Sequence, residues 1–247
     1  PGQQVVRSID LIMREVGNLK RIGNEFSAQD SGTLSIATTH TQARYVLPQI
    51  VARFKQDFPK VHLILQQASP TEIVEMLING EADIGIATES LTTEDELCSI
   101  PYYQWQHSVI VPQDHPLARQ ATITLDELAK WPIITYHGGF TGRSKIDETF
   151  KRAGLQPDIV LSALDADVIK TYVELGIGVG LIASIAFDPI KDRRLCQIEV
   201  DLFAKNTTWI AVRRGHLLRG FGYRFVELCS PSLDLVRLRQ AANIDEA

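Results

Sequence analysis

Hydrophobic residues recur along most of the chain with two periods, one of two residues and one of three to four. The first period is typical of strands and the second of amphipathic helices. In the first half of the chain the two patterns alternate in the order strand, helix, strand, helix, strand, which predicts a parallel sheet with right-handed crossovers. The predicted elements are a strand over 33–38, a helix over 42–57, a strand over 61–67, a helix over 70–79 capped by Gly80, and a strand over 82–87.

A second series of elements follows residue 100. Its predicted members are strands over 108–111, 133–135, 159–161 and 179–182 and helices over 125–129, 142–153 and 165–175. A strand near 206–212 then crosses back to the first series, and a helix over 217–230 follows it. We therefore expect an α/β fold with two Rossmann-like subdomains, joined by two crossovers that leave a cleft between them.

The pattern divides the chain into four parts. Residues 1–30 are predicted to be the end of a linker helix, and residues 235–247 a weakly patterned C-terminal tail. Effector-binding subdomain I is expected to comprise residues 31–100 and 207–234, and subdomain II residues 101–206. The chain is thus expected to pass between the subdomains twice.

The first segment has apolar residues at alternating intervals of four and three, which is the spacing of a coiled-coil seam. They are Val5, Ile9, Ile12, Val16 and Leu19, with Phe26 one heptad further on. Such a helix either pairs with a partner chain or packs on its own domain. We favour pairing because residues 29–32 break the pattern before the first strand. The chain also begins with Pro1 and has no initiator Met, which indicates that a further segment precedes it.

The composition is that of an ordinary globular protein, and it excludes several classes of function. The 247 residues carry a net charge of −5, so the chain is a poor candidate for binding a phosphate backbone over a broad surface. Three widely spaced cysteines without a metal-binding pattern indicate reduced thiols in a cytoplasmic protein. Neither a membrane span, a signal peptide nor a catalytic motif is found, so no membrane partner, metal or enzymatic activity is expected.

Threonines gather where predicted strands end and helices begin. Thr39 and Thr41 follow the first strand, Thr88 follows the third, and Thr141 precedes the helix over 142–153. The free N–H groups of a helix N-terminus, together with hydroxyl donors, suit a small anion without requiring a formal positive charge. Because ligands of open α/β sheets bind beyond the carboxyl ends of the strands, we expect these threonines to line a binding site. The alternative is that Thr39, Thr41 and Thr141 only cap their helices.

Three further features have both a functional and a structural interpretation. Trp105 follows the first crossover and either forms a wall of the cleft or belongs to the core. Asp165 precedes a helix and is expected to be its cap. The glycines of 176–180 follow a helix and precede a strand, the reverse of the dinucleotide-binding order, so we predict a tight turn there.

Three short segments carry a more specific pattern: TTHTQARY at 38–45, GFTGRS at 139–144 and DADVIKTY at 165–172. They resemble the LysR-type transcriptional regulators, and more narrowly the CysB/Cbl branch, which controls sulfur assimilation. The resemblance extends over about residues 5–232. It implies an effector-sensing domain whose fold is like that of the periplasmic binding proteins, with a small ligand between the two subdomains.

The resemblance also implies ligands, contacts and partners. The implied contacts are Thr39, Thr41, Gln42, Thr88 and Thr141, with Trp105 nearby. The effectors of this branch include sulfate, thiosulfate, adenylyl sulfate, O-acetylserine and N-acetylserine, and no other cofactor is implied. A cytoplasmic homodimer or homotetramer is implied, which binds promoter DNA through a winged helix-turn-helix upstream of this chain, with RNA polymerase as a further partner.

Two other classes of protein stay open as alternatives. A solute-binding protein for a small oxyanion shares the fold, but it would be exported and monomeric, whereas this chain shows no signal peptide and has a heptad helix. An enzyme on this fold is the weakest alternative, because no nucleophile and base pair can be named.

Overall fold

The computed structural model describes residues 30–120, 122–140, 142–229, 232 and 235–242, together with positions 2, 5, 6, 9, 12, 13, 16 and 17. The chain forms two compact units, and each is a mixed α/β structure as predicted. Unit 1 comprises Pro1–Thr38, Leu47–Tyr102 and Trp209–Ala247, and unit 2 comprises Thr39–Val46 and Tyr103–Thr208. The short segment 39–46, which the sequence pattern places in the first subdomain, therefore makes its contacts in unit 2.

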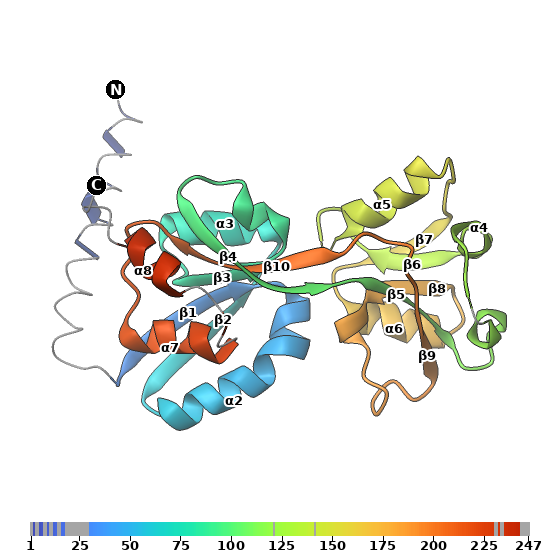
Figure 1. The fold of residues 1–247 in the computed structure, drawn as a ribbon, viewed down its shortest axis with the longest axis horizontal. Helices are drawn as coiled ribbons and strands as arrows, with labels where there is room; N and C mark the ends of the chain where they lie inside the picture. The colour runs from blue at the N-terminus through green and yellow to red at the C-terminus, as the bar shows by residue number, and fades with distance from the viewer. Residues whose placement is uncertain are drawn as a thin grey trace. The chain divides into compact units, whose positions relative to one another are not determined.

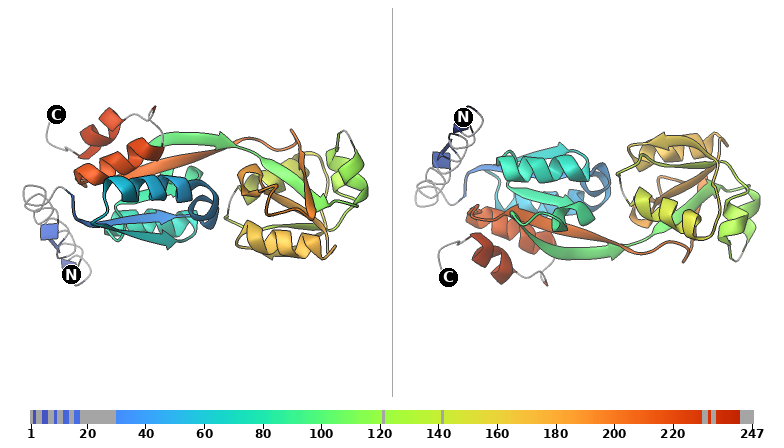
Figure 2. Two further views of the ribbon diagram at one scale, coloured as in Figure 1. Left: turned by 90° about the horizontal axis from the view of Figure 1, so that it is seen from below. Right: turned by 90° about the horizontal axis from the view of Figure 1, so that it is seen from above.

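The sheet of unit 1 has five strands in the order β2-β1-β3-β10-β4 (Figure 1). Strand β1 pairs in parallel with β2 and β3, as the alternation of strands and helices predicts, and β10 returns antiparallel to β3. Figure 2 shows β10, in orange, running beside the green β4 at the edge of this sheet. The strands are β1 (Gly32–Thr38), β2 (Val61–Gln67), β3 (Ile84–Ala87), β4 (Leu97–Trp105) and β10 (Asn206–Arg213).

Helices cover both faces of the unit 1 sheet (Figure 1). On one face α2 (Leu47–Asp57) packs on α7 (Gly220–Cys229), where the rings of Phe54 and Phe225 meet edge to face at 5.5 Å. On the other face lies α3 (Pro70–Asn79), which starts with a capping box from Ser69 and ends at the left-handed Gly80, as predicted. The remaining elements are the short helix η2 (Glu89–Thr92) and α8 (Leu235–Ala242).

The sheet of unit 2 also has five strands, in the order β7-β6-β8-β5-β9. Helices α4 and α5 pack on one face around Ile146 and Phe150, and α6 packs on the other around Ile169 and Val173. The strands are β5 (His107–Pro112), β6 (Ile133–Tyr136), β7 (Ile159–Ala163), β8 (Val179–Ala183) and β9 (Leu195–Glu199). The helices are η1 (Gln42–Val46), η3 (Pro116–Arg119), α4 (Leu125–Leu128), α5 (Arg143–Arg152), α6 (Ala166–Glu174) and η4 (Ser184–Ala186).

The observed elements differ from the predicted ones in several places. Strand β4 runs through Pro101, which the sheet tolerates because β4 is an edge strand. Strand β9 is also an edge strand, and its half-buried residues gave no clear alternation. The helix expected from Gly142 begins at Arg143, with Gly142 as its N-cap. The predicted tail contains α8, whose Leu238 is buried in the core of unit 1.

The predicted seam of the first segment lies only partly within the described residues. Val5, Ile9, Ile12 and Val16 are helical and between 38% and 62% exposed, while Leu19 and Phe26 lie outside the described part of the chain. Pairing of this helix with a partner chain therefore stays a prediction. Among the described residues, no helix has the length and apolar content needed to cross a bilayer.

Candidate functional site

The segment 39–46 follows β1 and carries three of the predicted ligand contacts. Thr39, Thr41 and Gln42 are 5%, 1% and 2% exposed, so their polar groups lie inside unit 2. The segment turns into a π-helix, η1, over Gln42–Val46. Such π-helical turns are rare and occur frequently at functional sites. The sequence pattern could not distinguish this turn from the α-helix that continues it.

A buried network of uncharged side chains surrounds Gln42. Its Oε1 accepts a hydrogen bond of 2.7 Å from the Tyr103 hydroxyl, and its Nε2 donates one of 3.4 Å to Oγ1 of Thr208. The same Thr208 oxygen accepts a bond of 3.1 Å from the indole N–H of Trp105. Residues from segment 39–46, β4 and β10 therefore converge on one buried hydroxyl. Trp105 is buried and hydrogen-bonded, which agrees with its interpretation as a core residue, and its place in the wall of a cleft stays a prediction.

Two tyrosines in this region, the half-buried Tyr103 and the buried Tyr136, stay protonated at neutral pH. Burial raises the pKa of Tyr103 to about 12, although hydrogen bonds to Thr208 and Gln42 lower it in part. Burial also raises the pKa of Tyr136, whose hydroxyl accepts a bond of 3.1 Å from the Ala183 N–H and is hydrogen-bonded to Thr41. The tyrosine hydroxyls that bond to Thr41 and Gln42 are therefore neutral dipoles, which suits a ligand held by hydrogen bonds and not by a salt bridge.

The segment 39–46 is anchored to helix α6 by the carboxylate of Asp167. The Tyr45 hydroxyl donates to Asp167 Oδ1 at 2.7 Å and Arg44 Nε donates to Oδ2 at 3.2 Å. Lys170 lies 3.3 Å from the same carboxylate, 3.0 Å from that of Asp192, and above the Tyr45 ring. Burial opposes ionisation of Asp167, but the bonds from Tyr45, Lys170 and Arg44 prevail and lower its pKa. We call this cluster the Asp167 anchor.

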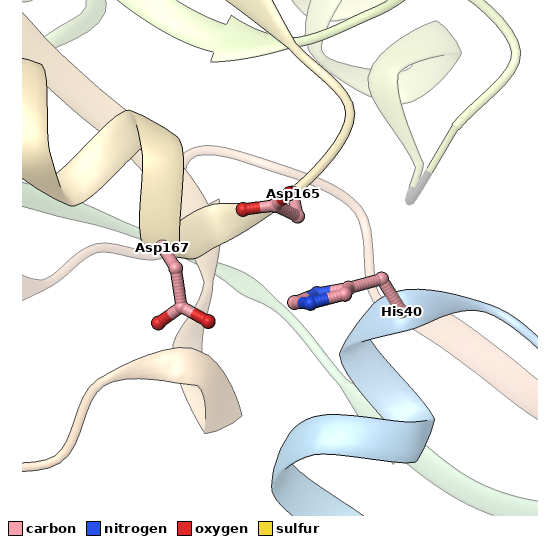
Figure 3. A group of neighbouring side chains, drawn as sticks. All are labelled: His40, Asp165 and Asp167. Carbon is pink, nitrogen blue, oxygen red and sulfur yellow. The ribbon is translucent and has the colours of Figure 1, made fainter. Parts of the chain in front are cut away.

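His40 points from the start of this segment toward Asp165 and Asp167 at the start of α6 (Figure 3). One potential metal-ligand atom from each of the three lies within 4.8 Å of the others. However, the Asp167 oxygens already accept bonds from Tyr45 and Arg44, and Asp165 caps α6 by accepting the Val168 N–H at 2.9 Å. The prediction that Asp165 is a helix cap is thus confirmed. We therefore assign Asp167 to an ion-pair network with Arg44 and Lys170 and Asp165 to the cap of α6, and we propose no metal site here.

The predicted site residues fall into three groups. Thr39, Thr41, Gln42 and Trp105 belong to unit 2 and share or adjoin the network described above. Thr88 belongs to unit 1, where it is 7% exposed and takes the N-cap position of η2 without a side-chain cap bond. Thr141 lies outside the described residues, so its predicted contact has no structural counterpart here.

Sequence reasoning missed two residues of the network, Tyr103 and Thr208. Tyr103 lies two residues before the crossover aromatic Trp105, and Thr208 lies 166 residues from Gln42 in the chain. The aromatic run at 102–105 was a usable signal for the first. No local pattern marks Thr208, because its role depends on where β10 returns to the sheet.

Comparison with known proteins identifies the family. The family model of the LysR substrate binding domain matches residues 27–233. The chain is 52% identical to the transcriptional regulator CysB of Burkholderia cenocepacia over 98% of this chain and 77% of that protein. It is 46% identical to the regulator Cbl of Escherichia coli over 97% of this chain and 76% of that protein.

A solved structure gives the same assignment. The crystal structure of the cofactor-binding domain of the Cbl regulator superposes with a TM-score of 0.82 at 49% identity, covering 86% of this chain and 93% of that one. These relatives are transcriptional regulators and not enzymes, in agreement with the expectation from the sequence. The chain therefore belongs to the LysR substrate-binding domain family, in the branch of the CysB and Cbl regulators.

Proposed function

We propose that this chain is the effector-sensing and oligomerisation domain of a regulator of sulfur and cysteine metabolism, and that it binds a small anion or an acetylated serine. The contacts are the hydroxyls of Thr39 and Thr41, the amide of Gln42 and the indole of Trp105. The observation that supports this most is the convergence of Gln42 and Trp105 on the buried Thr208. Thr88 and Thr141 are further proposed contacts.

The candidate effectors are sulfate, thiosulfate, adenylyl sulfate, O-acetylserine and N-acetylserine. All of them carry oxygen acceptors that neutral N–H and O–H donors can bind. A helical N-terminus adds a favourable partial positive charge, so a formal cation is not required. The neutral donors around Gln42 and Thr41 support this class of ligand over one that needs an arginine clamp.

We also propose that the regulator acts as a dimer or tetramer in the cytoplasm. An exposed apolar face on α6, made of Val168, Tyr172 and Leu175, supports self-association, and three free cysteines support a reducing compartment. Promoter DNA is proposed to bind through a helix-turn-helix domain, since the relatives are named as regulators of the helix-turn-helix type. RNA polymerase is a further proposed partner.

A thermal-shift screen with the five candidate effectors tests the binding proposal, because a ligand that binds the folded state raises the melting temperature. The best effector is then titrated by calorimetry into Thr39→Val, which removes one hydroxyl and keeps the branched shape. Loss of a hydrogen bond to a charged ligand costs about 1.5–3 kcal/mol, so binding should weaken by about ten- to a hundredfold. Thr122→Ala, at an exposed threonine, is the matched control.

Two results would contradict this proposal. One is a screen in which none of the five compounds raises the melting temperature. The other is a Thr39→Val variant that binds the effector as tightly as the wild type, with the Thr122→Ala control also unchanged. The second result would leave the effector in place and remove the assigned site.

A further inference from the structure

The first residue of β10, Asn206, carries a buried side-chain amide. Its side chain is 0% exposed, and neither Oδ1 nor Nδ2 has a hydrogen-bond partner among the residues that the structure describes. An amide offers two N–H donors and a carbonyl acceptor, and burial without partners is unfavourable for each of them. Native proteins rarely keep such a group unless a bound molecule satisfies it.

The surroundings of Asn206 connect it to the candidate site. Thr208 lies two residues further along the same strand, so the two side chains share one face of β10. Thr208 is the residue that accepts bonds from Gln42 and Trp105. Gln42, Trp105, Asn206 and Thr208 all belong to unit 2. The Asn206 amide therefore lies on the same face of β10 as Thr208, which belongs to the network that surrounds Gln42.

Gly142 leaves space for the side-chain amide of Asn206, because it has no side chain of its own. A Cβ atom at this position would lie 2.5 Å from Oδ1 of Asn206 and 2.9 Å from the His107 ring. Gly142 also has a φ of +68°, and it is the N-cap of α5 without a side-chain cap bond. Glycine at this position thus lets the amide of Asn206 lie against the first residue of a helix N-terminus, where a ligand with an acceptor group is favoured.

We propose that Asn206 is a specificity-determining ligand contact, which favours an effector with both donor and acceptor groups over a bare oxyanion. This inference rests on the proposed effector site. Sulfate has only acceptors at neutral pH, so it can satisfy Nδ2 of Asn206 but not Oδ1. N-acetylserine carries an amide N–H and a hydroxyl besides its carboxylate, so it can satisfy both ends of the Asn206 amide.

The test compares Asn206→Leu with the wild type. Leucine has a similar size and no unpaired polar atoms, so the ligand-free variant should melt at or above the wild-type temperature. Calorimetric titration should show at least about tenfold weaker binding of N-acetylserine, with a smaller loss for sulfate. Asn79→Leu, at an exposed asparagine of α3, is the matched control and should change neither affinity. Asn206→Ala removes the amide without introducing a branched side chain. It should change the ratio of the N-acetylserine and sulfate affinities in the same way as Asn206→Leu.

The results of this test distinguish failure of this inference from failure of the proposed function. If both Asn206 variants melt lower and bind both probes within about twofold of the wild type, Asn206 is a structural residue and this inference is wrong. Equal losses for sulfate and N-acetylserine would likewise overturn the proposed selectivity. A wild-type chain that binds none of the five effectors overturns the proposed function and this inference together. Wild-type binding with unchanged Asn206 variants overturns this inference alone.

Discussion

Removal of the Asp167 carboxylate should detach segment 39–46 from α6 and destabilise unit 2. In Asp167→Ala, Tyr45 loses a half-buried hydrogen bond of 2.7 Å to a charged group, which contributes about 1.5–3 kcal/mol. The Arg44 pair is 48% and 39% exposed and adds at most about 1 kcal/mol. Lys170 retains Asp192 at 3.0 Å, so it loses little. We expect the free energy of unfolding to fall by about 2–3 kcal/mol, which lowers the melting temperature on the order of 10 °C.

Tryptophan fluorescence can report this change for unit 2 alone. Trp105 and Trp131 belong to unit 2 and Trp209 to unit 1, so a Trp209→Phe background leaves only unit 2 reporters. Tyr45→Phe should reproduce most of the loss, and the double variant should be no less stable than Asp167→Ala, because both changes remove the same bond.

The dependence on pH follows from the lowered pKa of Asp167. A depressed folded-state pKa contributes stability above the unfolded value, and this contribution is lost as the pH falls through the folded value. The difference between wild type and Asp167→Ala should therefore be constant near neutrality and shrink below about pH 4. A loss below about 0.5 kcal/mol at pH 7, or additive effects in the double variant, would refute the anchor.

Two further predictions follow from single positions. Gly142→Ala should lower the melting temperature of unit 2, because the new Cβ would lie 2.5 Å from Asn206 Oδ1 and the backbone φ of +68° disfavours alanine. Gly138→Ala is the control, since Gly138 has open space around it, and equal stability of the two variants would contradict the close approach at Gly142. Burial raises the pKa of the Cys229 thiol to about 12, so at pH 8 this thiol is protonated and should react slowly with a labelling reagent. Cys229→Ser should therefore leave the fast phase of thiol labelling unchanged, and loss of that phase would show a reactive thiolate at Cys229.

The strand ends could be predicted from sequence, and most of the proposed contact residues were chosen from them. Thr39 and Thr41 were chosen because the first strand was predicted to end at Thr38 and to pair in parallel with its neighbours, so that the carboxyl edge follows from the order of elements. Asp165 and Gly80 were recognised as helix ends because caps depend only on local chemistry. These features need no knowledge of the packing between distant segments.

The missing parts of the site depend on long-range packing. Thr208 and Asn206 lie at the start of β10, a strand whose partner in the sheet, β3, ends at Ala87. A sequence pattern can place a strand there, but it does not tell which side chain will face a residue more than a hundred positions away. Nor can a sequence pattern show that the Asn206 amide has no hydrogen-bond partner among the described residues and lies close to Gly142.

Gln42 is hydrogen-bonded within unit 2 and Asn206 has no such bond among the described residues, so we expect the two amides to contribute differently to binding. Gln42 is held firmly through its oxygen, by the 2.7 Å bond from Tyr103, while its Nε2 reaches Thr208 at 3.4 Å, near the outer limit of a hydrogen bond. A ligand that takes the Nε2 donor therefore displaces only a weak internal bond and leaves the orientation of Gln42 unchanged. Asn206 has no internal bond to displace among the described residues, so a ligand gains its full hydrogen-bonding capacity. Replacement of Asn206 should consequently lower the effector affinity more than replacement of Gln42, although Gln42 lies closer in the sequence to Thr39 and Thr41.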